Sequence, residues 1–85
     1  MTPKQLRQLR ATPPTETGNR LAVAFEITEL TQSDCVRGTR FTAAYVSDMV
    51  RGRFQNISID NARTFADWFG CSIEDLFPSR EAVSA

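Results

Sequence analysis

The side chains of this chain that could do chemistry gather on one face of a short predicted helix, residues 43–51. That face carries small or polar side chains, namely Ala43, Ala44, Ser47, Asp48 and Arg51. Val46 and Met49 lie three residues apart, so they share the opposite face and are expected to point inward. Because short polar side chains seldom fill a core, we interpret the first face as a surface that reads a partner molecule.

Catalytic and metal-binding chemistry have little support in the same sequence. The chain contains no histidine, no glycine-rich phosphate loop and no paired carboxylates attached to an obvious pocket. Its only cysteines, Cys35 and Cys71, occupy positions where the helical pattern favours a small apolar residue. We therefore expect buried, reduced thiols, no metal, no cofactor and no enzymatic activity, with a disulfide as the less favoured alternative.

Length and charge indicate one small domain with a positive front half. No stretch of the 85 residues approaches the roughly 18–20 apolar residues of a membrane span, and the N-terminus lacks a signal pattern. The net charge is zero, but residues 1–53 hold eight basic and five acidic side chains, whereas residues 54–85 hold two and five. Such a front half suits phosphates, although the asymmetry can also arise by chance.

Two capped helices must position the reading face. Thr31 can cap a helix over about residues 32–39, with Asp34 as its capping-box partner. Thr42 can cap the helix that follows, and Gly52 can end it.

Three further helices are expected around this pair. The first runs from about Thr17 to Glu29, and Leu30 closes it against the next helix. Ser58 caps a second helix, which Gly70 ends, and Ser72 caps a short last helix with Asp75. The apolar stripe of the Ser58-capped helix consists of Ile59, Ala62, Phe65, Ala66 and Phe69.

The order of these features resembles the phage repressor and Cro-type helix-turn-helix family, often called the Xre family. The resemblance rests on short features spread between Thr31 and Phe77 and reaches back to Arg20. These features are Thr31 and Gln32, Cys35 and Val36, Phe41 and Thr42, Val46 and Met49, Arg51 and Gly52, and the block SIDNARTFADWFGCSIEDLF over residues 58–77. The resemblance implies an all-α, compact five-helix, lambda-repressor-like domain over residues 17–78.

The same resemblance implies roles for individual residues. In this family the third helix enters the major groove with its N-terminal residues over the bases. The positions that match base-facing residues are Ala43, Ala44, Ser47 and Asp48. The positions that match phosphate contacts, together with plausible extra anchors, are Gln32, Thr42, Tyr45, Arg53, Asn56, Arg37, Arg40 and Arg51.

Each of these roles has a structural alternative. Asp48 could form a surface ion pair with Arg51 or Arg40, and Arg51 could tie its helix to the domain. Trp68 lies beside the apolar stripe of its helix, so it could be a residue of the core rim or a dimer contact.

The turn between the two central helices departs from the family pattern. The family usually places a large apolar residue and then a glycine there, whereas this chain has Thr39 and Arg40, with Gly38 one position earlier. A left-handed conformation would cost Arg40 about 1 kcal/mol or more. We therefore expect a rebuilt turn, with Gly38 as the candidate for its centre.

Residues 1–16 and 79–85 flank the expected domain. Residues 1–16 form either a short docked helix or a mobile basic arm, with Lys4, Arg7 and Arg10, that wraps DNA. Residues 79–85 are expected to be loose.

The resemblance implies a sequence-specific transcriptional regulator that binds double-stranded DNA as a homodimer on a two-fold operator. We expect it in the cytoplasm of a bacterial or phage-infected cell, associated with the nucleoid. The alternative is an antitoxin, or another protein-binding module with this fold, because the acidic C-terminal half could meet a basic partner such as a toxin.

Overall fold

The computed structural model describes residues 1–15, 18–53 and 57–78. Within these residues the chain forms six α-helices and no strand, which confirms the predicted all-α class. The helices are α1 (Pro3–Ala11), α2 (Leu21–Thr28), α3 (Gln32–Gly38), α4 (Ala43–Arg51), α5 (Ile59–Phe69) and α6 (Ile73–Leu76). The last five correspond to the five expected helices, and α1 is the extra helix.

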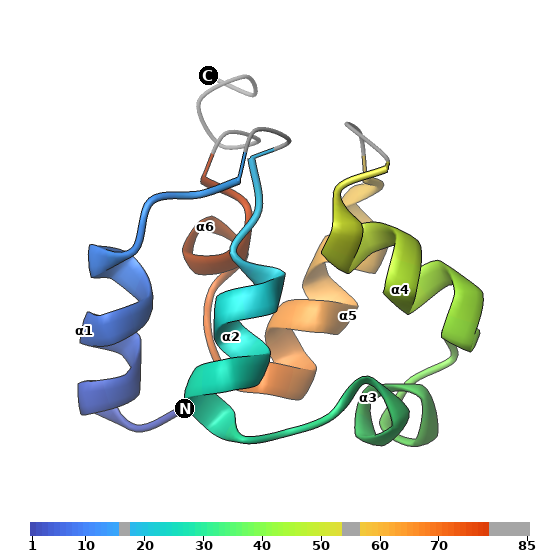
Figure 1. Ribbon diagram of the computed structural model, residues 1–85, viewed down its shortest axis with the longest axis horizontal. Helices are drawn as coiled ribbons and strands as arrows, with labels where there is room; N and C mark the ends of the chain where they lie inside the picture. The colour runs from blue at the N-terminus through green and yellow to red at the C-terminus, as the bar shows by residue number, and fades with distance from the viewer. Residues whose placement is uncertain (16–17, 54–56, 79–85) are drawn as a thin grey trace.

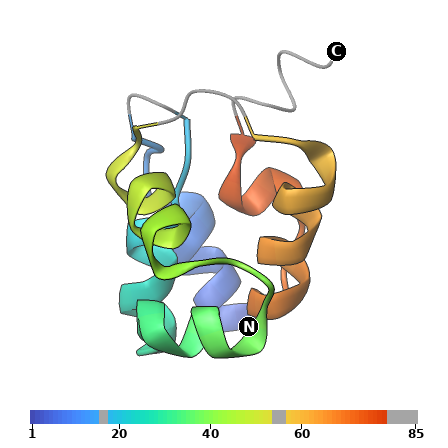
Figure 2. The same ribbon diagram turned by 90° about the vertical axis from the view of Figure 1, so that its right-hand side faces the viewer.

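The helix pair formed by α3 and α4 lies at one end of the molecule, and α1 lies at the other, with α2, α5 and α6 between them (Figure 1). Figure 2 shows the same arrangement from the side of the helix pair, with α1 behind it. α4 packs on α3 and α2, while α1 packs on α2 and α6. The fold therefore leaves one side of α3 and α4 uncovered by the other helices.

The core is centred on α5. Four members of its predicted stripe are buried, namely Ala62, Phe65, Ala66 and Phe69. The ring of Phe65, which is fully buried, lies 4.5 Å from that of Phe41 and 6.2 Å from that of Phe77 between centroids. This core joins the helix pair to α5 and to the segment after α6.

Two apolar residues with predicted packing roles, Ile59 of the α5 stripe and Leu30, are exposed. Ile59, with 47% of its surface exposed, is the first residue of α5 after the Ser58 cap, and its side chain lies outside the core. Leu30, 37% exposed, follows Glu29, whose left-handed backbone (φ 60°) ends α2 and redirects the chain. Leu30 therefore lies outside the core, and its predicted contact with the next helix stays a prediction.

α2 begins later than the sequence predicts. Its first residue is Leu21 rather than one near Thr17, which lies outside the described residues. Gly18 has a φ of 83°, a left-handed conformation that a helix cannot contain, and the backbone N–H of Arg20 donates to the carbonyl of Leu76 (2.8 Å). The start of α2 is thus set partly by a contact with α6.

The N-terminal segment is a docked helix in this structure. Thr2 caps α1 in a capping box with Gln5, and Leu9 is fully buried. Because α1 lies at the end opposite the helix pair, the structure does not show the arm that the sequence left as an alternative (Figure 1). Residues 79–85 lie outside the described part, so their looseness and the domain boundaries stay predictions.

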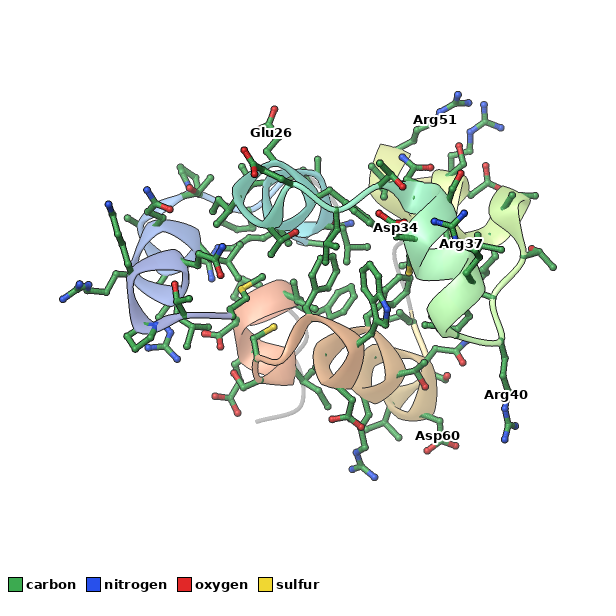
Figure 3. All side chains as sticks on the ribbon, turned by 90° about the horizontal axis from the view of Figure 1, so that it is seen from below. Glu26, Asp34, Arg37, Arg40, Arg51 and Asp60 are labelled. Carbon is green, nitrogen blue, oxygen red and sulfur yellow. The ribbon has the colours of Figure 1, made fainter. Side chains whose placement is uncertain are left out.

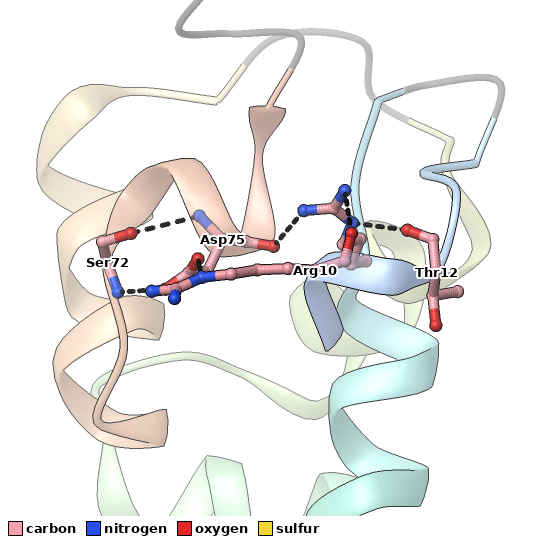
Figure 4. Close-up of polar contacts among 5 residues, drawn as sticks. Arg10, Thr12, Ser72 and Asp75 are labelled. Atoms are coloured by element: carbon pink, nitrogen blue, oxygen red, sulfur yellow. Dashed lines mark hydrogen bonds and ion pairs between the residues drawn. The ribbon is translucent and has the colours of Figure 1, made fainter. Parts of the chain in front are cut away.

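An arginine cluster joins α1, α2 and α6 (Figure 4). Arg10 donates from Nε to Asp75 Oδ1 at 2.6 Å, and Asp75 also completes a capping box with Ser72. Arg20 donates to the backbone carbonyls of Thr12, Asp75 and Arg10. The hydrogen bond from Arg10 lowers the pKa of the Asp75 carboxyl, and bonds from Ser72 add to this effect against burial, which raises it.

Candidate nucleic-acid interface

Caps fix both helices of the pair at the predicted residues. The Thr31 hydroxyl accepts from the backbone N–H of Asp34 (3.1 Å), whose carboxylate accepts from the N–H of Thr31 (2.9 Å). Hydrogen bonding from the backbone N–H and then from the hydroxyl of Thr31 to the Asp34 carboxylate lowers the pKa of that carboxyl. The Thr42 hydroxyl accepts from the N–H of Tyr45 (3.1 Å), and Gly52 ends α4 in a left-handed conformation (φ 75°).

The turn between the helices contains no left-handed residue, so it is rebuilt as expected, although its hydrogen bonds centre on Thr39 rather than on Gly38. α3 ends at Gly38, and Thr39 is extended (φ −135°) instead of continuing the helix. The Thr39 hydroxyl donates to the carbonyl of Cys35 (2.7 Å) and accepts from the N–H of Phe41 (3.2 Å). A threonine side chain thus builds this connection, where the family that the sequence resembles usually has a glycine.

α4 is anchored by its inner face and by a buried amide. Val46 and Met49 are buried, as their spacing predicts. The side chain of Asn19, which is 2% exposed, donates to the Met49 carbonyl (3.1 Å) and accepts from the Leu21 N–H (3.1 Å). Sequence reasoning did not identify Asn19. Its position just before an apolar helix is the one feature of the sequence that could have indicated a structural role for this amide.

The four predicted base-facing residues lie on the outer side of α4. Ala43 and Ala44 are exposed, whereas Ser47 and Asp48 are partly buried. Asp48 forms an ion pair with Arg53 (Oδ1 to Nε, 3.5 Å) rather than with Arg51 or Arg40. With 31% and 63% of their side-chain surfaces exposed, this pair contributes little to stability.

A hollow of about 390 Å³ lies between α3 and α4, and we call it the α3–α4 hollow. Its lining comes from α3 with Gln32, Ser33, Val36 and Arg37, and from α4 with Ala43 and Ser47. The structure therefore brings two predicted base-facing residues together with two predicted phosphate contacts. Ser33 and Val36 were not predicted as site residues.

Four arginines and two aspartates lie between residues 31 and 53, so the helix pair is positive overall. Arg37 pairs with Asp34 along α3. Arg40 and Arg51 extend away from the protein near the helix pair (Figure 3), and neither forms an ion pair with another described residue. The alternative in which a salt bridge of Arg51 ties α4 to the domain has no support within the described residues. Asn56 lies outside them.

Tyr45 is turned toward α5. Its hydroxyl accepts a hydrogen bond from Asn61 Nδ2 (3.0 Å), and its ring centroid lies 4.8 Å from that of Phe41. The hydrogen bond from Asn61 holds the first turn of α4 against α5, and a phosphate contact by Tyr45 stays a prediction.

Trp68 of α5 is partly buried and packs against α2 and α3. Its ring centroid is 6.1 Å from that of Phe25 and 4.8 Å from that of Phe69. On its other side the indole meets the backbone of Gly38 at the end of α3. This arrangement agrees with the core-rim alternative.

The cysteines are free thiols, and Cys35 is buried, as predicted. Cys71 is only partly buried, which corrects the prediction, although burial still raises its pKa to about 11. No three His, Cys, Asp or Glu side chains of the described residues are grouped so that they could hold a metal ion. No helix in the described part is both long and apolar enough to span a membrane.

Comparison with known proteins gives two matches. A family model described as the Cro/C1-type HTH DNA-binding domain matches residues 20–78. The SPbeta prophage-derived uncharacterized HTH-type transcriptional regulator YotL of Bacillus subtilis (strain 168) is 43% identical over 44 residues. That match covers 52% of this chain and 55% of the relative, so the chain spans about half the length of this curated protein. No solved structure matches the chain at a significant level.

Proposed function

This chain belongs to the Cro/C1-type helix-turn-helix DNA-binding family, and we propose that it regulates transcription by placing α4 in the major groove of an operator. In this proposal Ala43, Ala44, Ser47 and Asp48 face the bases. The phosphate contacts come from Gln32, Thr42, Tyr45, Arg53 and Asn56, with Arg37, Arg40 and Arg51 as further anchors.

One observation carries this proposal: the α3–α4 hollow joins side chains of both predicted roles on one uncovered surface. Gln32 and Arg37 come from α3, while Ala43 and Ser47 come from the first two turns of α4. A helix pair that reads DNA must present base contacts and phosphate contacts on the same side, because the groove and its flanking backbones are met together.

Charge supports the same surface. The four arginines between residues 31 and 53 are all exposed, and two of them, Arg40 and Arg51, have no acidic partner within the described residues. Exposed guanidinium groups can contact phosphates and release their counterions, which is the main source of affinity in such complexes.

We further propose that two copies bind a two-fold operator in the bacterial cytoplasm. Symmetric dimers of helix-turn-helix proteins meet half-sites about one helical turn apart, so the sites should repeat at about 10 bp. Analytical ultracentrifugation with and without operator DNA tests the stoichiometry.

A protein partner such as a toxin has weaker support. Asp60, Asp67 and Glu74 are exposed and could face a basic protein. Asp75, however, is 5% exposed and is used internally by Arg10, which leaves a smaller acidic surface than the sequence predicted. We therefore rank DNA binding first. Co-purification of a stoichiometric partner would raise the rank of the alternative.

In-vitro selection from random duplexes, followed by titration of the recovered duplex at several salt concentrations, tests the proposed function. We expect an enriched sequence with a half-site repeat, and an affinity that falls linearly with salt on logarithmic axes. Absence of binding to any duplex at low salt would contradict the proposal.

A further inference from the structure

We propose that the α3–α4 hollow receives the 5-methyl group of a thymine, with Val36 and Ala43 as the side chains that contact it. The inference rests on the proposed function and adds a residue of α3 to the specificity determinants. It also names thymine as a base that α4 can recognise, although the first two residues of this helix are alanines.

The walls of the hollow suit a methyl group. Val36 lies in the middle of α3 and is partly buried against the core, and Ala43 is the exposed first residue of α4. Neither side chain can donate or accept a hydrogen bond. A polar base atom pressed against them would lose its water without gaining a partner, whereas a methyl group loses nothing by leaving water.

The rim of the hollow is polar, with Gln32 and Ser33 on α3 and Ser47 on α4. In the major groove a thymine shows its methyl group beside the O4 acceptor, so an apolar wall next to hydroxyl and amide groups matches its edge. The volume of about 390 Å³ exceeds that of a methyl group, and the hollow can therefore admit the pyrimidine edge that carries it.

The positive charge around the hollow favours DNA over a free small molecule as its ligand. Arg37 forms part of the lining, and Arg51 and Arg53 extend the positive surface beyond α4. Because the lining includes the predicted phosphate contact Gln32 and the predicted base contact Ser47, a duplex positioned by its backbone would bring base edges to this point.

Deoxyuridine differs from thymidine only by the missing methyl group, so it gives a direct test. The duplex recovered by selection is prepared with each thymine replaced in turn by uracil, and the affinity of each duplex is measured. We expect one position per half-site at which the replacement weakens binding about fourfold, the effect of removing one buried methyl group.

Measuring single protein variants with both the thymine and the uracil duplex shows whether that base position contacts the hollow. Ala43→Gly removes the methyl wall on α4, and Val36→Thr keeps the shape of Val36 while adding a hydroxyl. Both variants should reduce the preference for thymine over uracil at that one position. Ala22→Gly is the matched control, because Ala22 is exposed in the first turn of α2 but neither lines the hollow nor belongs to the proposed DNA contacts. It should leave the preference unchanged.

The outcomes separate the inference from the proposed function. If every uracil duplex binds as tightly as the unmodified duplex, and that binding is tight and sequence-selective, the hollow is not a methyl site. The proposed DNA binding is then unaffected. A thymine preference that Ala22→Gly reduces as much as Ala43→Gly also overturns the assignment. Failure to bind any duplex overturns the proposed function itself. Circular dichroism of Val36→Thr identifies misfolding, in which case the comparison of Ala43→Gly with Ala22→Gly decides alone.

Discussion

Gly38, the last residue of α3, lies directly against the indole of Trp68 in α5. A Cβ atom on Gly38 would lie 2.3 Å from Trp68 Nε1 and 2.9 Å from Cδ1, closer than packed atoms can approach. Phe25 and Phe69 hold the indole from its other sides. The missing side chain at Gly38 therefore sets how closely α3 approaches α5, and this contact helps to orient the helix pair.

Gly38→Ala should force the indole or α3 to shift. We expect the free energy of unfolding to fall by about 1–3 kcal/mol, as for overpacked sites, with weaker DNA binding and altered tryptophan fluorescence. Urea denaturation followed by fluorescence and circular dichroism measures the effect. Adding Trp68→Leu in the same chain should restore part of the spacing, and a stable single variant with unchanged fluorescence would contradict this contact.

Asp75→Asn should remove a pH-dependent source of stability. Because the folded state lowers the pKa of Asp75, its carboxylate stabilises the fold above the unfolded pKa of about 3.9, and this contribution is lost as the pH falls through the lower folded value. The variant should therefore be less stable than the wild type at pH 7, and the difference should shrink below pH 4. Urea denaturation at pH 7, 5 and 3 tests this, with the exposed Asp67→Asn as control. A difference independent of pH would exclude the mechanism.

Asn19→Ala should destabilise the protein by about 1–3 kcal/mol, because the Met49 carbonyl and the Leu21 N–H would lose a buried partner. Since Met49 lies in α4, DNA affinity should fall as well. Thermal and urea denaturation measure the loss. Asn61→Ala is the comparison, since its bond to Tyr45 is only partly buried and should matter less.

Substituting the two members of the Asp48–Arg53 ion pair should have opposite effects on DNA affinity. Asp48→Ala should change sequence preference and strengthen non-specific binding at low salt, because a carboxylate near phosphates is removed and Arg53 is released. Arg53→Ala should weaken binding to all DNA sequences alike. It should also reduce the slope of log affinity against log salt concentration by about 1. Selection and salt titrations with both variants distinguish these effects. If both variants lose the same affinity for every DNA sequence, Asp48 does not belong to the base-facing residues.

Both thiols should react slowly in the folded protein. Burial raises the pKa of the Cys35 thiol and brings that of Cys71 to about 11, so few thiolates exist at pH 8. A chromogenic disulfide reagent should label the folded chain slowly and the urea-unfolded chain fast. Rapid labelling of one thiol without urea would indicate that Cys71 is more accessible than the structure shows.

The sequence by itself determined where most helices begin and end. Thr31, Thr42, Ser58 and Ser72 each cap a helix through a backbone N–H three residues away. Such bonds depend only on neighbouring residues, and so they can be read from the chain. The burial of Val46 and Met49 followed from helical periodicity in the same way. The residues assigned to DNA contact came from a resemblance, and they stay predictions.

The tertiary structure decided the contacts between residues far apart in the chain. Asn19 meets Met49, Gly38 meets Trp68, and Arg10 meets Asp75 because whole helices pack together. The lining of the α3–α4 hollow likewise depends on how two helices cross, so Val36 could not be recognised beside Ala43 in advance. Local hydrogen bonds are specified by adjacent residues, whereas these pairs exist only once the core around Phe65 has formed.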